Sequence, residues 1–253
     1  MKYEQENRIN FKRLQGGNRI SKAYAKKAIL YGNKIEVFDY KKIQVSFKDS
    51  RIFHRKNLKT ERSQSSINRA RNNLFRLIDS NVNRHGKYSA VFVTLTFKEN
   101  KTDLKPCNQE FKLFIKRLNY RLDTKLKYVT VPEWQKRGAV HYHCVFFNLP
   151  FLNKLELESI WGHGFTNIQL VKNSTAMAGY LAKYFSKACS DPRLYGQRAY
   201  MTSRGLFRPI EVYGGHEVDN VTESATIKKE IVQEFKTYQH TKIITQKYAD
   251  TNK

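Results

Sequence analysis

"AVHYHCVFF" (residues 139–147) is an apolar, aromatic run that carries two histidines separated by one residue. A short run of this composition predicts a buried β-strand. Alternate side chains on a strand share a face, so His141 and His143 point the same way, about 7 Å apart along the chain. Two imidazoles on one face can hold one divalent cation. The alternative is two histidines on a solvated strand face.

The segment before this run supplies a possible third ligand. Residues 126–134, "LKYVTVPEW", predict a strand, and Arg137 and Gly138 predict a turn between the two strands. Glu133 closes the first strand, so a tight hairpin would place it beside His141 and His143. Two histidines and a carboxylate suit Mg²⁺ or Mn²⁺, with open positions for a phosphate oxygen. The same ligand set occurs in iron oxygenases, but the basic charge of the chain favours a polyanionic substrate.

The order of elements around this hairpin predicts the fold class. Apolar alternation marks strands, and apolar residues at helical spacing mark helices. The predicted strands are residues 89–97, 126–134, 139–147 and 164–172, and the predicted helices are 106–122, 155–161 and 174–187. The order β-α-β-β-α-β-α, with an antiparallel hairpin in the middle, predicts an α+β fold. We expect a ferredoxin-like (split βαβ) antiparallel sheet with helices packed on one face.

Composition divides the chain into three predicted parts. Residues 1–58 are strongly basic, with strand-like alternation at 33–49, and are expected to form a DNA-facing extension or small subdomain. Residues 59–212 form the expected central domain, which opens with a helix near 61–82. Residues 213–253 are expected to be a polar tail with a possible helix at 224–238.

The charge of the chain indicates its partner. Lys and Arg number 47 against 22 Asp and Glu among 253 residues, a formal net charge of +25. So large an excess of one sign attracts polyanions, with nucleic acid as the leading partner and an anionic membrane surface as the second. The sequence has neither an apolar run of about 18 residues nor a signal peptide. Its three cysteines form no C-x-x-C pair, so a cytoplasmic location is expected.

A candidate nucleophile lies in residues 179–187, "GYLAKYFSK". At about 100° per residue, Tyr180, Lys183, Tyr184 and Lys187 fall within one arc of a helix. The opposite side is small and apolar and is expected to pack on the sheet. A nearby ammonium favours the phenolate of a tyrosine and stabilises charge on a transferring phosphate. Two tyrosines one turn apart can act alternately, one cutting while the other holds a strand end; the alternative is half-buried core tyrosines.

Basic residues near both ends of the predicted central domain are candidates for binding DNA. A loop that mixes arginines with aromatic residues suits single-stranded DNA, through backbone charge and base stacking. Arginines on the helix near residue 62 can grip phosphates, or can be a solvated helix face. The candidate DNA-binding residues are Arg62, Arg69, Arg198, Tyr200, Arg204 and Arg208.

Three stretches together resemble the motifs of the HUH endonucleases, which include the rolling-circle replication initiators of small plasmids and single-stranded DNA phages. "FVTLTF" (residues 92–97) resembles their first motif, and "HYH" (141–143) resembles their histidine motif. "YLAKYFSK" (180–187) resembles their Tyr-x-x-Lys motif, present here twice in overlapping form. Single-tyrosine viral initiators carry an acidic third ligand eight or nine residues before the first histidine, a position that Glu133 fits. The resemblance covers roughly residues 60–212.

The resemblance implies site- and strand-specific nicking of origin DNA, dependent on Mg²⁺ or Mn²⁺. A 5′-phosphotyrosine intermediate and a free 3′-OH would form, and a later joining step would release a circle. Tyr180 is favoured, narrowly, as the tyrosine that attacks first. No P-loop sequence accompanies the motifs, so a host helicase is expected beside the host DNA polymerase. The alternatives are a conjugative relaxase, a tyrosine transposase, or a non-catalytic DNA-binding regulator.

Overall fold

The structure is a computed structural model that describes residues 20–47, 62–223, 225–236 and 241–251. The chain divides into two compact units. The central unit is Asn57–Arg208, and the terminal unit joins Met1–Lys56 to Pro209–Lys253. Among the described residues, no helix is long and apolar enough to cross a membrane.

The central unit is built on one antiparallel sheet with the strand order β6-β3-β5-β4-β7. The first four strands along the chain follow the split βαβ order, so the predicted α+β, ferredoxin-like fold class is confirmed. The strands are β3 (Val91–Thr96), β4 (Tyr128–Trp134), β5 (Val140–Phe146), β6 (Thr166–Leu170) and β7 (Met201–Thr202). The helices are α2 (Gln64–Asp79), α3 (Leu104–Arg121), α4 (Lys154–Trp161) and α5 (Ser174–Cys189), with a 3₁₀ turn, η3, at Pro192–Leu194.

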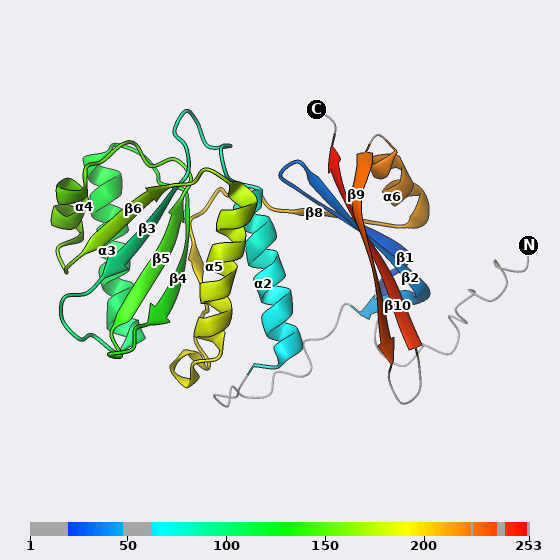
Figure 1. Cartoon of the computed structure of the whole chain (residues 1–253), viewed down its shortest axis with the longest axis horizontal. Coiled ribbons are helices and arrows are strands. Elements are labelled where there is room, and N and C mark those ends of the chain that lie inside the picture. The colour runs from blue at the N-terminus through cyan, green and yellow to red at the C-terminus, as the bar shows by residue number, and fades with distance from the viewer. Residues whose placement is uncertain (1–19, 48–61, 224, 237–240, 252–253) are drawn as a thin grey trace, which may run out of the picture. The chain divides into compact units, whose positions relative to one another are not determined.

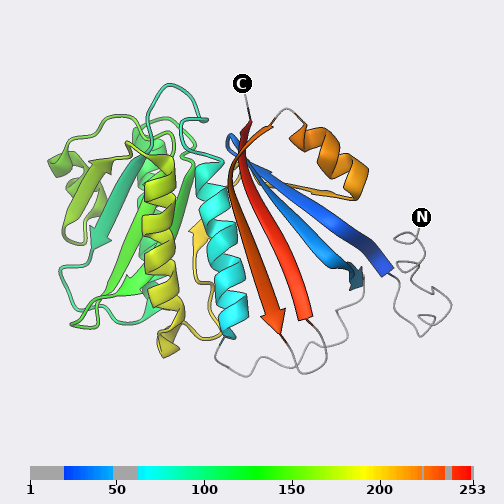
Figure 2. The same cartoon turned by 45° about the vertical axis from the view of Figure 1, so that its right-hand side comes forward.

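Helices cover both faces of this sheet (Figures 1 and 2). The crossover helices α3 and α4 share one face, as predicted: the ring of Phe111 on α3 lies 4.9 Å from that of Tyr142 on β5. Helix α5 covers the opposite face, where the ring of Tyr184 stacks on His143 of β5, and α2 packs beside α5. The predicted placement of helices on one face therefore describes α3 and α4 but not α5. Strand β5 is buried along almost its whole length, as a strand covered on both faces must be.

Local sequence signals fix the ends of the helices that position the site. The side chain of Asp103 caps α3, Asn153 caps α4 and Asn173 caps α5, each by accepting a backbone N–H of the first turn. Helix α4 ends at Gly162, whose φ of 72° is in the left-handed region that favours glycine. These boundaries lie within a few residues of those predicted from the sequence.

The terminal unit is a second antiparallel sheet, with the order β8-β1-β2-β10-β9. A short helix, α6, lies beside β1, where Asp219 pairs with Lys26 at 2.9 Å and Val218 packs with Ala28 and Ile35. The elements are β1 (Ile20–Tyr31), β2 (Lys34–Phe47), β8 (Ile210–Tyr213), α6 (Gly215–Thr222), β9 (Ala225–Lys236) and β10 (Thr241–Thr251).

The terminal unit differs from the parts predicted at both ends of the chain. The helix predicted at residues 224–238 is wrong, because residues 225–236 form strand β9. Their apolar residues recur every four positions, which imitates a helix, but pairing with β10 decides the conformation. Residues 213–253 are thus not a tail: β10 joins them to β2 of the predicted N-terminal part. Residues 1–19 and 48–58 of that part lie outside the described residues.

Candidate active site

Strand register gathers the predicted ligands on one face of the central sheet. Glu133 on β4 lies directly opposite His141 on β5, as the hairpin spacing predicts. On the other side of β5, Thr96 of β3 lies opposite His141 and Thr94 lies opposite His143. Residues paired across antiparallel strands share a face, so both threonines stand beside the histidines. The sequence analysis missed them, although the alternation of "FVTLT" carries the signal.

Glu133 is the centre of the polar contacts. Its Oε2 lies 2.7 Å from Nε2 of His143, and the ammonium of Lys187 donates to its Oε1. Glu133 and His143 are both buried, and the His141 ring centre lies 6.1 Å from that of His143. A carboxylate held by two donors in a buried setting has a fixed position and orientation.

The surroundings set the charge of these groups. Burial by itself would raise the pKa of Glu133, but hydrogen bonds from His143 and Lys187 outweigh it and lower that pKa below its ordinary value. Burial, assisted by the neighbouring His143, lowers the pKa of His141 to about 4. Near neutral pH Glu133 is therefore ionised and His141 is neutral, the forms in which these side chains bind metal ions.

Two imidazole nitrogens in this cluster have chemistry to spare. Nε2 of His141 and Nδ1 of His143 are buried and lack a hydrogen-bond partner. Such an atom is rare unless a ligand or ion serves it. Within the described residues, however, no three His, Cys, Asp or Glu side chains are arranged around one point as a metal site. Glu133 instead holds His143 and Lys187, so the donor types fit a divalent cation while the carboxylate is engaged with neighbouring side chains.

Helix α5 brings both predicted tyrosines over this face. The ring of Tyr184 stacks on that of His143 with centres 3.7 Å apart, and the ring of Tyr180 lies 5.4 Å from that of Phe92 on β3. The two hydroxyl oxygens lie 2.6 Å apart. The tyrosines were predicted on the side of α5 away from the sheet; in the structure they lie on it.

The apolar side of α5 explains this orientation. Its residues Leu181 and Phe185 are fully buried, and the Phe185 ring lies 5.9 Å from that of Tyr200 in the segment before β7. Helix α5 also packs along α2 and β4. The apolar side therefore finds its core beside the sheet edge and α2, which leaves the tyrosine side above β3 and β5.

The two tyrosines differ in exposure and in ionisation. Tyr180 is 44% exposed, whereas Tyr184 is half-buried against His143. Burial, together with the hydrogen bond to Tyr180, raises the pKa of Tyr184 above its ordinary value. Tyr184 therefore holds its proton more firmly than a free phenol.

The predicted lysines separate. Lys187 donates to Glu133 rather than contacting Tyr184. Lys183 lies in a groove between α5 and α2, beside Arg71 and Ser186. Among the described residues it makes no side-chain hydrogen bond to either tyrosine, so the predicted pairing of Lys183 with Tyr180 is absent.

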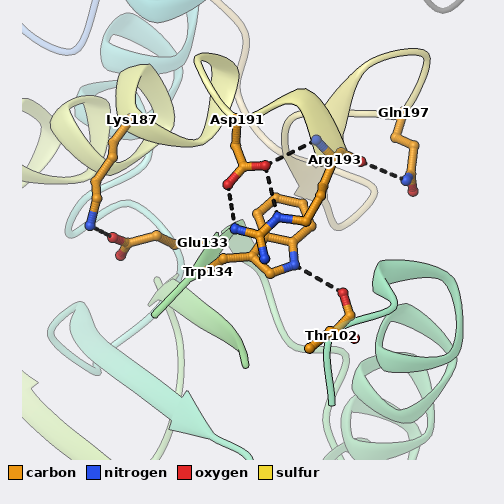
Figure 3. Close-up of polar contacts among 7 residues, drawn as sticks. All are labelled: Thr102, Glu133, Trp134, Lys187, Asp191, Arg193 and Gln197. Carbon is orange, nitrogen blue, oxygen red and sulfur yellow. Dashed lines mark hydrogen bonds and ion pairs between the residues drawn. The ribbon is translucent and has the colours of Figure 1, made fainter. Parts of the chain in front are cut away.

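A cluster that no motif revealed supports the strand end at Glu133 (Figure 3). The indole of Trp134 donates to the carbonyl of Thr102 at 3.0 Å, and the guanidinium of Arg193 lies 4.7 Å from the centre of the Trp134 ring. Asp191 in turn holds Arg193 at 2.6 Å. These contacts join β4 to the turn that follows α5, the two elements that carry Glu133 and Lys187.

Four of the predicted DNA-binding residues meet around one cavity of about 730 Å³. They are Arg62, Arg198, Tyr200 and Arg208. The other two do not line it: Arg69 is exposed on α2, and Arg204, also exposed, accepts a hydrogen bond from Lys127 through its carbonyl.

The fold and the cluster define a ferredoxin-like α+β protein with histidines, a carboxylate and two tyrosines on one sheet face. Residues 90–189 match the model of a family of replication-associated proteins, the ORF2 family. The matched segment runs from the start of β3 to the end of α5 and includes every residue of the cluster. This similarity supports a Rep-type replication initiator that acts on the DNA of its own replicon. Searches of curated proteins and of solved structures found no match.

Proposed function

We propose that this protein initiates rolling-circle DNA replication by nicking one strand of origin DNA with a tyrosine. The observation that carries the proposal is the position of the Tyr180 and Tyr184 hydroxyls over the sheet face that holds Glu133 and the two histidines. The match of residues 90–189 to replication-associated proteins supports the biological role. The three motifs that resemble those of HUH endonucleases support the chemistry.

Tyr180 is the favoured first nucleophile. Its exposure leaves it open to a DNA strand, whereas Tyr184 is packed on His143 with a raised pKa. In the reaction the phenol oxygen of Tyr180 forms a bond to phosphorus while the bond from phosphorus to the 3′ oxygen breaks. The leaving oxygen takes up a proton and becomes the 3′-OH primer, and the 5′ end stays attached as a phosphotyrosine. Attack of a 3′-OH on that phosphotyrosine reverses the step and joins the strand.

Glu133, His141 and His143 would hold the metal ion, Mg²⁺ or Mn²⁺. When bound there, the ion would polarise a non-bridging oxygen of the scissile phosphate. Lys187 would then give up its hydrogen bond to Glu133, and its ammonium would become available to the negative charge that develops on the phosphate. The unpartnered Nε2 of His141 and the ionised state of Glu133 support this assignment.

Tyr184 has a role in the second half of the cycle. Its hydroxyl lies 2.6 Å from that of Tyr180, so either oxygen can reach a phosphate bound above the pair. While one tyrosine holds the 5′ end, the other can attack at the regenerated origin. Host enzymes would supply helicase and DNA polymerase activity between these events.

The test incubates the full chain with labelled single-stranded fragments of its own replicon and Mn²⁺, followed by denaturing electrophoresis. We expect a covalent protein–DNA adduct, and peptide mapping should place it on Tyr180 or Tyr184. The double variant Tyr180→Phe, Tyr184→Phe should form none. His141→Ala should reduce nicking at least about 100-fold and leave DNA binding largely intact. Tight binding without an adduct in Mg²⁺ or Mn²⁺ would instead indicate a non-catalytic DNA-binding protein.

A further inference from the structure

A second site lies on the far side of α5 from the tyrosines. The cavity of about 730 Å³ is enclosed by α2, α3, α5 and the segment that leads into β7, all within the central unit. Phe185 lines this cavity, while Tyr184, the preceding residue, stacks on His143 over the sheet. The cavity is therefore separate from the proposed nicking site.

The cavity is lined by cations without counter-ions. Its basic residues are Arg62, Lys112, Arg198 and Arg208, and no carboxylate lines it. Arg62 is fixed in place, because it donates to the carbonyl of Gln197 and lies 3.4 Å from Sγ of Cys189. Among the described residues, the side chains of Lys112, Arg198 and Arg208 make no hydrogen bond or ion pair. Four cations around one hollow, three of them unpaired, create a field that favours a phosphate-bearing ligand.

The same cavity offers surfaces for a base. Tyr128, Phe185 and Tyr200 line it, and Asn108 and Gln197 add side-chain amides. Aromatic rings beside a basic groove bind nucleotides by stacking, whatever the base. The volume falls within the range of small-ligand sites, about 300–1,000 Å³. A nucleotide, with a flat apolar base and an anionic phosphate, matches both halves of this lining.

We propose that this cavity binds a nucleotide of the single DNA strand that is nicked over the sheet, with the phosphate on Lys112 and Arg198 and the base against Tyr128 and Tyr200. The inference rests on the proposed function, because it takes single-stranded DNA as the substrate. The strand is thereby held at a second point on the other side of α5. A free nucleotide has the same chemistry, so the test separates the two sources.

The binding test uses the full chain with Tyr180→Phe and Tyr184→Phe, so that no cleavage occurs, and a fluorescein-labelled dT20 probe. The cavity variant is Lys112→Ala with Arg198→Ala, two exposed residues whose replacement leaves the core intact. The control is Lys105→Ala with Lys116→Ala, which removes the same charge from α3 outside the cavity. We expect the cavity variant to bind about tenfold more weakly and the control within about twofold. The salt dependence, log Kd against log salt, should also fall by about 1.4 for two lost phosphate contacts.

Cross-linking locates the contact. The same probe with iodouracil in place of thymine should attach to Tyr128, Phe185 or Tyr200 on irradiation. Equal losses in the cavity and control variants, or cross-links confined to other residues, would overturn the proposal. A cavity saturated by dTTP but not cross-linked by the oligonucleotide would also overturn it, in favour of a free nucleotide. Wild-type protein that cross-links in the cavity yet never nicks would contradict only the nicking proposal.

Discussion

Tyr180 and Tyr184 share one local sequence pattern but have different surroundings. Each tyrosine precedes a lysine by three residues, so the sequence alone hardly separates them. In the folded chain Tyr184 is packed on His143, whereas Tyr180 is exposed at the rim of the same cluster. An exposed phenol reaches a DNA strand without displacing protein atoms. Position therefore ranks the two residues where the motif does not.

The first prediction follows from this ranking. Tyr180→Phe should slow single-turnover nicking at least about 100-fold, because it removes the attacking oxygen. Tyr184→Phe should slow nicking less than about tenfold but prevent the joining step. The measurement is the rate of adduct formation, followed by strand joining, on one labelled oligonucleotide. Equal DNA affinity of the two variants serves as the control, and the reverse order of nicking rates would assign the first attack to Tyr184.

A second prediction concerns Asp191, which holds Arg193 over Trp134. The hydrogen bond from Arg193 lowers the pKa of Asp191 against the opposing effect of burial. A carboxyl with a lowered folded-state pKa contributes stability above its unfolded pKa, about 4, and loses it as the pH falls through the folded value.

Asp191→Asn keeps the cap on the N–H of Arg193 and removes the charge. It should lower the free energy of unfolding by at most about 1 kcal/mol at pH 7, since the pair is partly exposed. That difference from wild type should shrink as the pH falls below about 4. Urea denaturation at a series of pH values measures it, and a difference that stays constant down to pH values well below that point would refute the charge-based explanation.

How much of the site the sequence predicts depends on the range of the contacts. The two-residue period of a strand and the hairpin spacing are local, and they were sufficient to place Glu133 beside His141. The bond from Lys187 to Glu133 joins residues 54 positions apart, so no local pattern contains it. Contacts of Arg193 with Trp134 are equally remote in sequence.

At the scale of elements, every strand and helix predicted between residues 89 and 187 is present. The failures share one cause, which is a choice between partners that periodicity does not encode. The tyrosine side of α5 faces the sheet because its apolar side has α2 and β4 as alternatives. Strand β9 resembles a helix in its apolar spacing and becomes a strand because β10 is available to pair.

The junction between α4 and β6 gives the third prediction. Gly164 has a φ of 143°, and a Cβ there would lie 2.5 Å from the nitrogen of Lys98 and 2.6 Å from the carbonyl oxygen of Thr96. The chain is held this close because Lys98 donates to the carbonyl of His163 at 2.7 Å and Thr96 to that of Phe165 at 2.9 Å. Backbone atoms cannot move aside as a flexible side chain can.

Gly164→Ala should therefore lower the free energy of unfolding by about 3 kcal/mol, from backbone strain and steric overlap together. Gly86→Ala is the matched control: its φ of 95° is also unfavourable, but a Cβ there meets no atom within 4 Å. The control should lose only about 1 kcal/mol. Chemical denaturation compares them, and equal losses would show that the close approach at Gly164 is not what matters.

At the scale of the whole molecule, the candidate nicking site and the nucleotide cavity both belong to the central unit. That unit has a large core of its own, built from both faces of the β6-β3-β5-β4-β7 sheet. The described core of the terminal unit is much smaller, with Ala28, Ile35 and Val218 at its centre. A unit that contains its own core and all of its site residues can in principle fold and act alone.

The last prediction tests that independence with a fragment of residues 57–208. It should unfold cooperatively on heating and form the covalent adduct with single-stranded DNA at a rate within about threefold of the full chain, since no site residue lies outside it. Adduct formation by the fragment with and without His141→Ala controls for contaminating nucleases. A fragment that folds but forms no adduct would show that the terminal unit completes the site. A fragment that fails to fold would show that the stability of the core depends on residues beyond Arg208 or before Asn57.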